Sequence, residues 1–166
     1  MFDPSAFINA MGAAVTGVTV VTTTTAAGAP IGRTVSAMCS VSAEPPLLLV
    51  AIRTESPLVA AIQARGAFAV NVLSDGQTGV SEAFAGRGPG AHVFRTRDWW
   101  PLTGGAPPLL HGAAARFRCD VASTTPAGTH TLVLGAVSHA ERGVTTPLAY
   151  TRRGYVAPLT TERLAA

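Results

Sequence analysis

The residues best suited to chemistry lie between Gly32 and Pro46, where small and hydroxyl-bearing side chains follow one another. Apolar and polar positions alternate along this stretch, with Val35, Ala37, Cys39 and Val41 interleaved with Thr34, Ser36, Met38, Ser40 and Ser42. This period of two predicts a strand. Because its side chains are short, a flat ligand could approach closely enough for backbone N–H and C=O groups to bond its edge. The alternative is a packed barrel strand whose serines face solvent.

The other reactive residue types form no recognisable catalytic arrangement. The nine carboxylates show no acid–base pair, and the four histidines and two cysteines lack the spacing of a metal site. The sequence has no G-x-S-x-G elbow, P-loop or Rossmann fingerprint. All twelve basic residues are arginine, so no lysine is present for Schiff-base chemistry. Such a chain either binds passively or borrows its chemistry from a cofactor.

Length and composition predict a single domain spanning residues 1–166. Hydrophobic residues make up 48% and charged residues 13%, which favours a folded chain that hides part of its apolar surface in a dimer. The net charge of +3 is modest and its arginines are scattered, so we expect no nucleic-acid partner. No apolar run is long enough to span a membrane, and the N-terminus lacks signal-peptide features. We therefore expect a cytoplasmic protein with two buried free thiols, Cys39 and Cys119.

The first half of the chain predicts two helices and three strands. Asp3-Pro4 opens a short helix whose buried face would include Phe7 and Met11, together with Ala10 and Ala14. A β-branched run predicts a strand over 17–25, paired by a hairpin with the 32–46 stretch. Residues 47–52 resemble a central strand. Ser56-Pro57 starts a helix that ends at Gly66.

The second half predicts a strand over 67–73, a short helix from Ser74 or Asp75 through Phe84, and later strands over 113–123, 131–140 and 150–156. The loop over 86–105 is rich in aromatic residues, which we expect to cover the barrel or the dimer interface rather than contact a ligand. Since the strands do not alternate regularly with helices, the expected fold is mostly β: an antiparallel split barrel with peripheral helices.

The order of several blocks resembles the short-chain flavin reductase family. These blocks are T-G-V-T-V-V-T-T, then G-R-T-V-S-A-M-C-S-V-S-A-E-P-P-L-L-L-V, then G-A-F-A-V-N-V-L, then P-A-G-T-H-T-L-V-L-G-A-V, and the resemblance extends from Phe7 to Tyr155. Members of this family are the reductase partners of two-component flavin monooxygenases and have the FMN-binding split-barrel fold. One departure is Gly128-Thr129-His130, where the family usually has Gly-Asp-His, which leaves the contribution of that acid in question.

The resemblance implies a homodimer with FMN or FAD lying along Thr34–Ala37, and NADH or NADPH as hydride donor. The flavin-binding residues would be Arg33, Thr34, Val35, Ser36, Ala37, Ser40, Val41, Ser42, Arg53, Ser56, Asn71, Gln77 and Ser81. The residues themselves support the phosphate-binding part of this prediction, because Ser56 lies at a predicted helix N-terminus beside Arg53, and such a place favours an anion. Ser56 could equally be only a helix cap. Asn71 could instead satisfy a bulge, and Gln77 could be exposed to solvent.

His130 is the predicted catalytic-site residue. Hydride transfer from a nicotinamide to a flavin needs stacked rings rather than a protein acid, so a histidine at the pocket mouth would position the nicotinamide. It could instead bond only its own turn. The expected function is an NAD(P)H-dependent flavin reductase that supplies reduced flavin to a separate monooxygenase. The alternatives are a flavin-binding protein with another redox or carrier role, and a non-catalytic dimeric scaffold.

Overall fold

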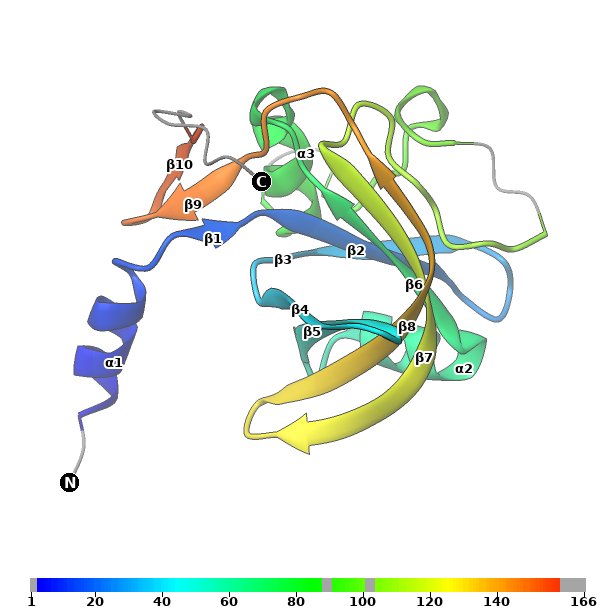
Figure 1. Cartoon of the computed structure of the whole chain (residues 1–166), viewed down its shortest axis with the longest axis horizontal. Helices are drawn as coiled ribbons and strands as arrows, with labels where there is room; N and C mark the ends of the chain where they lie inside the picture. Colours follow the sequence, from blue (N-terminus) through cyan, green and yellow to red (C-terminus); the bar gives the residue numbers. More distant parts are fainter. Residues whose placement is uncertain (1–2, 88–90, 101–103, 159–166) are drawn as a thin grey trace.

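A seven-stranded antiparallel sheet organises the chain, in the order β3-β2-β6-β7-β8-β5-β4 (Figure 1). The computed structural model describes residues 3–87, 91–100 and 104–158. The strands of this sheet are β2 (Thr19–Thr24), β3 (Pro30–Val35), β4 (Met38–Ala43), β5 (Pro46–Arg53), β6 (Ala67–Val72), β7 (Ala115–Ala127) and β8 (His130–Arg142). The prediction of a mostly β, antiparallel fold with peripheral helices is therefore confirmed.

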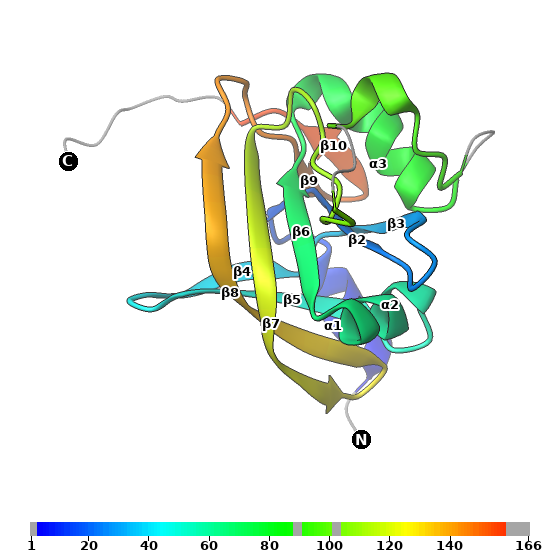
Figure 2. The same cartoon turned by 90° about the vertical axis from the view of Figure 1, so that its right-hand side faces the viewer.

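The remaining elements surround this sheet. A small antiparallel sheet joins β1 (Thr16–Gly17), β9 (Ala149–Thr151) and β10 (Gly154–Val156). The helices are α1 (Pro4–Met11), α2 (Pro57–Arg65) and α3 (Thr78–Phe84), with short 3-10 helices at Asp75–Gln77 and Thr96–Asp98. Figures 1 and 2 show α2 and α3 near opposite ends of the large sheet. In the part of the chain that the structure describes, no helix is long and apolar enough to cross a membrane.

The predicted strand over 32–46 is two strands, which corrects the expectation of a continuous one. β3 ends at Val35 and β4 begins at Met38, and the two lie at opposite edges of the sheet. The chain crosses from one edge to the other through Ser36 and Ala37. β3 and β4 do not pair with each other in the described ladders, so the sheet is coiled but not closed into the expected barrel.

The helix α2 forms as the sequence predicts, because its end signals are local. Ser56 is the N-cap, with its Oγ accepting a hydrogen bond from the Leu58 N–H at 3.4 Å. Gly66 follows the last turn with φ 72°, a left-handed conformation that costs glycine little. Leu58 and Ile62, both fully buried, anchor the helix in the main apolar core. This anchoring fixes the corner where β5 meets α2.

A second apolar cluster lies beneath α3. Phe84 contacts the rings of Phe94 and Trp99, with centroids 4.9 and 5.4 Å apart. The latter two residues come from the aromatic loop, which therefore covers the sheet as predicted. Because this cluster fixes Phe84 at the end of α3, it also fixes one wall of the pocket described below.

Other local expectations were wrong. The helix α1 forms, but none of its residues is buried, and Phe7 and Met11 are 56% and 51% exposed. Figure 1 shows α1 standing apart from the large sheet, which explains why its apolar face has no cover within the chain. Cys39 is exposed rather than buried, whereas Cys119 is buried, and both are free thiols. β5 is next to the sheet edge rather than central.

Candidate active site

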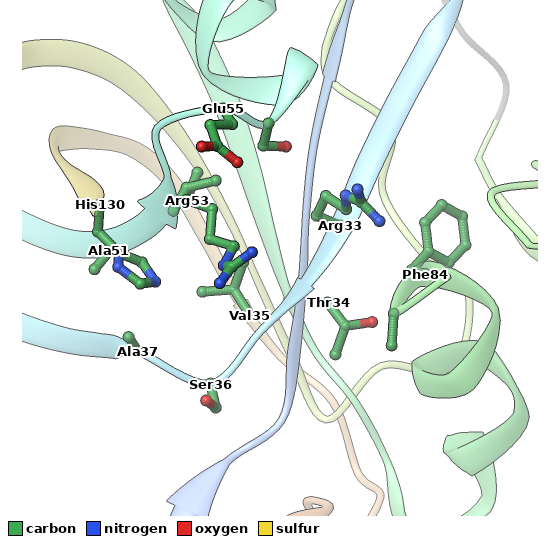
Figure 3. Close-up of a pocket in the computed structure, with 13 residues that line it drawn as sticks. Arg33, Thr34, Val35, Ser36, Ala37, Ala51, Arg53, Glu55, Phe84 and His130 are labelled. Atoms are coloured by element: carbon green, nitrogen blue, oxygen red, sulfur yellow. The ribbon is translucent and has the colours of Figure 1, made fainter. Parts of the chain in front are cut away.

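A pocket of about 510 Å³ opens where β3 approaches the end of β5 (Figure 3). Its wall combines β3, the crossing segment, the corner between β5 and α2, the end of α3 and the start of β8. The lining residues are Arg33, Thr34, Val35, Ser36, Ala37, Ala51, Ile52, Arg53, Glu55, Ser56, Phe84, Ala85 and His130. Eight predicted site residues lie among them: Arg33, Thr34, Val35, Ser36, Ala37, Arg53, Ser56 and His130.

The crossing segment exposes backbone to this pocket. Ser36 and Ala37 are exposed and belong to neither strand. Their carbonyl oxygens accept hydrogen bonds from the N–H groups of Met38 and Ala51, at 3.1 and 2.9 Å. Their own N–H groups have no backbone acceptor within the described ranges 3–87, 91–100 and 104–158. Because the side chains here are small, these donors are accessible to a flat ligand that carries acceptors on its edge.

The polar end of the pocket is cationic. Arg33 from β3 and Arg53 from the end of β5 both line it, against one carboxylate, Glu55. Ser56, which is 9% exposed, lies at the N-terminus of α2, where the helix dipole favours an anion. Two guanidinium groups and a helix N-terminus together suit a phosphate. Figure 3 shows the side chains of Arg33 and Arg53 within the pocket.

Arg33 is held by His92, a residue of the aromatic loop over 86–105. Its Nη1 lies 3.0 Å from Nε2 of His92. Since a guanidinium only donates, Nε2 must be the acceptor, which places the proton of a neutral imidazole on Nδ1. Partial burial lowers the pKa of His92, and the charge of Arg33 lowers it further. The backbone of His92 has φ 61°, in the left-handed region, and its backbone N–H donates to the Ala83 carbonyl at 3.0 Å. Loop geometry therefore fixes this contact.

His130 lies at the pocket through the tight β7–β8 hairpin. It pairs in register with Arg53 across β8 and β5, and it is half-buried. The hydroxyl of Thr129 lies 2.9 Å from His130 Nδ1. Thr129, which stands where the family usually has an acid, can thus hold the ring through Nδ1 and leave Nε2 free for another partner.

Three predicted residues on β4 do not line the pocket. Ser40, Val41 and Ser42 lie beyond the crossing segment, on the strand that forms the far edge of the sheet. The register with β5 shifts between Ser40 and Ser42, and Val41 at this bulge is 51% exposed. The Ser42 Oγ accepts a hydrogen bond from the N–H of Glu44 at 3.2 Å. Their predicted place beside Thr34–Ala37 rested on treating β3 and β4 as one strand, and a flavin contact on β4 stays a prediction.

Three further predicted residues do not line the pocket and are held by protein contacts. Asn71 is fully buried, donating to the Val20 carbonyl at 3.1 Å and accepting from the Leu110 N–H at 2.8 Å. Gln77 donates to the His111 carbonyl at 2.7 Å. Ser81 is 1% exposed, and its Oγ accepts from the Tyr155 hydroxyl at 2.9 Å. Their polar groups hold segments of the chain together, and a flavin contact at any of the three stays a prediction.

Sequence reasoning missed five lining residues: Ala51, Ile52, Glu55, Phe84 and Ala85. Ala51 and Ile52 lie in a predicted strand, and Glu55 precedes a predicted helix cap. Their closeness in sequence to Arg53 and Ser56 was the only feature that could have indicated their place in the site. Phe84 and Ala85 arrive from a distant helix, and no local pattern marks them. Among the described residues, no group of histidine, cysteine and acidic side chains could hold a metal ion.

The pocket has exposed backbone flanked by small side chains on one side and two arginines at its polar end. This arrangement suits a flat, anionic ligand. Comparison with known proteins identifies the class. A family model described as "Flavin reductase like domain" matches residues 11–158. The chain belongs to this flavin reductase family.

Individual relatives agree with this assignment. The chain is 45% identical over 158 residues to a flavin reductase (NADH) of Kitasatospora aureofaciens, covering 93% of this chain and 82% of the relative. It is 41% identical to a probable flavin reductase of Rhizobium meliloti, covering 95% of this chain but only 50% of that relative. It is 38% identical to the reductase subunit HsaB of a flavin-dependent monooxygenase from Mycobacterium tuberculosis, covering 81% and 70%.

Two solved structures share the fold along nearly their whole length. The flavin reductase PheA2 in its native state superimposes with a TM-score of 0.86 at 35% identity, covering 95% of this chain and 99% of that one. The NADH:FAD oxidoreductase SgcE6 of Streptomyces globisporus, in complex with NAD and FAD fragments, gives 0.84 at 30% identity, covering 98% and 99%.

Proposed function

We propose that this protein is an NADH-dependent flavin reductase whose flavin lies along Thr34–Ala37. The pocket at the crossing segment carries this proposal, because it joins unpartnered backbone donors, small side chains and two arginines. The names of the Kitasatospora and Streptomyces proteins, which specify NADH, support the choice of hydride donor. No observation favours the carrier or scaffold alternatives.

The residues present fit a flavin nucleotide. The N–H groups of Ser36 and Ala37 would donate to acceptors on the ring edge, and Ala51 and Ala85 leave room for the ring plane. Arg33 and Arg53 would hold the phosphate at the cationic end. The bound flavin supplies the hydride-accepting chemistry, while the protein supplies position.

His130 would position the nicotinamide over the flavin. The hairpin that carries it turns at Gly128 and Thr129, and His130 lines the pocket. With Nδ1 engaged by Thr129, Nε2 can contact the carboxamide of a nicotinamide. Since the flavin needs no protein proton to accept hydride, this role is positional and should affect the nicotinamide kinetics more than flavin affinity.

The direct test is to titrate the purified protein with FMN and FAD, then follow NADH oxidation in air. Ala37→Leu should block the approach to the backbone and weaken flavin binding. Ala43→Leu, an exposed change on β4 outside the pocket, is the matched control and should bind as wild type. If Ala37→Leu binds flavin as tightly as Ala43→Leu, this placement of the ring is wrong. If flavin binds but NADH and NADPH are not consumed, the reductase function is wrong.

His130→Ala tests the nicotinamide position separately. A higher KM for NADH with unchanged kcat would indicate lost binding, and a matching fall in kcat and kcat/KM would indicate lost alignment. Thr129→Val removes the hydroxyl that holds Nδ1 and should shift the same parameters in the same direction, by less. If His130→Ala leaves KM for NADH and kcat unchanged, His130 is only part of its turn and does not position the nicotinamide.

We further propose that the protein is a homodimer and that it delivers reduced flavin to a separate monooxygenase. The exposed apolar face of α1, formed by Phe7, Ile8 and Met11, is surface that a second copy could cover. The similarity to HsaB, which is named as the reductase subunit of a flavin-dependent monooxygenase, supports the second proposal. Analytical ultracentrifugation tests the dimer, and a monomer at micromolar concentration would contradict it. Release of reduced flavin, measured anaerobically, tests delivery.

A further inference from the structure

The C-terminal strand β10 carries one side chain that reaches the helix behind the large pocket. Tyr155 donates through its phenolic hydroxyl to Glu82 Oε1 at 2.5 Å, and the same hydroxyl lies 2.9 Å from Ser81 Oγ. Both partners belong to α3, and the end of this helix supplies Phe84 and Ala85 to the pocket. The hydroxyl therefore joins the small C-terminal sheet to one wall of the proposed flavin site.

The position of Tyr155 is fixed by the small sheet. Tyr155 pairs in register with Tyr150 on β9, and the two rings meet edge to face with centroids 5.4 Å apart. Next to β9, the Leu148 carbonyl accepts from the Val18 N–H at 3.1 Å, and the Leu148 N–H donates to the Leu73 carbonyl at 2.8 Å. These bonds join the small sheet to the large one. The β framework thus sets the place of Tyr155 independently of α3.

The helix α3 needs outside support because it is short. Its seven residues make about two turns, and a helix of that length is not stable by itself. From β3, Thr34 Oγ1 donates to the Ser81 carbonyl at 2.7 Å, and Figure 3 shows this hydroxyl directed toward α3. Two strands therefore hold the same turn of α3, β3 through Thr34 and β10 through Tyr155.

The bond from Tyr155 to Glu82 is suited to a lasting contact. Burial raises the pKa of Tyr155, and the hydrogen bond to Glu82 raises it further, so the phenol stays protonated and remains a donor near neutral pH. A bond from a hydroxyl to a carboxylate is stronger than one between neutral groups. The other partner of Glu82 is the exposed guanidinium of Arg87 at 3.8 Å, and such a surface ion pair contributes little.

We propose that the Tyr155 hydroxyl positions the α3 wall of the large pocket, so that Phe84 and Ala85 are in place when flavin binds. This inference rests on the proposed function, which puts the flavin ring in that pocket. Tyr155 does not line the pocket and acts through α3. A bond that is equally present in free and bound protein cancels from the affinity. Its loss weakens binding only if α3 then leaves its place in part of the free molecules, because the apparent affinity falls with the competent fraction.

The experiment compares FMN titrations of wild type, Tyr155→Phe and Tyr150→Phe at a temperature where urea unfolding shows all three to be fully folded. Tyr155→Phe keeps the ring and deletes the bonds to α3. Tyr150→Phe is the matched control, because it deletes the hydroxyl of the neighbouring ring, which has no hydrogen-bond partner among the described residues. Tyr155→Phe should weaken FMN binding about three- to tenfold, whereas Tyr150→Phe should bind as wild type. Unchanged FMN affinity in Tyr155→Phe, whatever its unfolding midpoint, would leave only a structural role and overturn the proposal, and so would equal losses in both variants.

Steady-state kinetics separate positioning from a part in the reaction. Saturating FMN selects the molecules whose wall is in place, so the KM for FMN should rise in Tyr155→Phe while kcat with NADH stays at the wild-type value. A fall in kcat at an unchanged KM for FMN would overturn the proposal, because it would assign Tyr155 to hydride transfer rather than to the seating of flavin.

Glu82→Ala tests the same bond from the helix side and keeps the inference testable if Tyr155→Phe does not fold, because Glu82 is only partly buried. It should weaken FMN binding in the wild-type background and have little further effect in Tyr155→Phe, where the bond is already lost. Unchanged FMN affinity in Glu82→Ala, or equal losses in both backgrounds, would overturn the proposal. If wild type binds no flavin at all, the proposed function itself fails, which is a distinct result.

Discussion

Replacing Asn71 with alanine should destabilise the fold and leave flavin affinity unchanged. The side chain is fully buried between β2 and the segment at Leu110, with its Nδ2 donating to the Val20 carbonyl at 3.1 Å and its Oδ1 accepting from the Leu110 N–H at 2.8 Å. Alanine removes both bonds and leaves the buried Leu110 N–H without its acceptor, whereas the Val20 carbonyl still faces the backbone of residue 71 in the β2–β6 ladder. An unpaired buried group costs about 1–3 kcal/mol, and a lost hydrogen bond costs about 1 kcal/mol.

The two losses together predict about 3 kcal/mol of lost unfolding free energy. With a urea dependence of roughly 2 kcal/mol per molar, the unfolding midpoint should fall by about 1.5 M. Thr22→Val is a graded comparison, because it deletes a single hydroxyl that donates to the Pro108 carbonyl at 2.7 Å and should cost less than half as much. Flavin titration at low urea gives the binding arm of the assay.

Two results would refute this reasoning. An unfolding midpoint equal to that of wild type would show that the buried amide contributes nothing to the fold. A large loss of flavin affinity at unchanged stability would restore the original hypothesis that Asn71 binds the cofactor.

Three further perturbations test other features. Gly135→Ala should lower the free energy of unfolding by about 1–3 kcal/mol or more, because the added Cβ would lie 2.6 Å from Cys119 Cβ. Gly154→Ala is the control: its nearest atom would be 3.7 Å away, so it should melt at the wild-type temperature. Equal melting temperatures of the two variants would contradict this prediction. Burial raises the pKa of the Cys119 thiol to about 12, so a thiol reagent near neutral pH should label Cys39 first and Cys119 only in denaturant, and equal rates would contradict the structure. Burial and the neighbouring guanidinium lower the pKa of His92 below its ordinary 6.5. The unfolded chain therefore binds more protons than the folded one, and stability falls as the pH falls below 6.5. His92→Gln should flatten this dependence of the urea midpoint on pH, and parallel curves for the variant and wild type would exclude a contribution of His92.

The parts of the site that the sequence predicted are those formed by neighbours along the chain. Thr34 to Ala37 form one continuous wall, and Arg53 and Ser56 share one tight corner. The helix after Ser56 was predictable because its start and stop signals lie within the helix ends themselves. Residues from remote elements, such as Phe84 and His92, could not be assigned to the site, since only the packing of the aromatic cluster brings them there.

The strand break at Ser36 and Ala37 was not predictable from periodicity. Apolar and polar residues go on alternating across it, and alternation does not reveal when a strand changes its partner. The helix α1 failed in another way. Its apolar positions were recognised correctly, but they predicted burial that no other part of the described chain supplies.

The crossing at Ser36 and Ala37 has a consequence for how the molecule folds. β3 and β4 adjoin in sequence but end the sheet on opposite sides, so the wall of the large pocket exists only when both outer ladders have formed. A partly folded chain that had only the long β7–β8 hairpin and its neighbours would have no site. A ligand held there binds only the completed sheet. Its binding therefore raises the free energy of global unfolding by RT ln(1 + [L]/Kd). Amide hydrogen exchange should therefore slow together at β3 and β4 when the pocket is filled, although the two strands share no hydrogen bond in the described ladders.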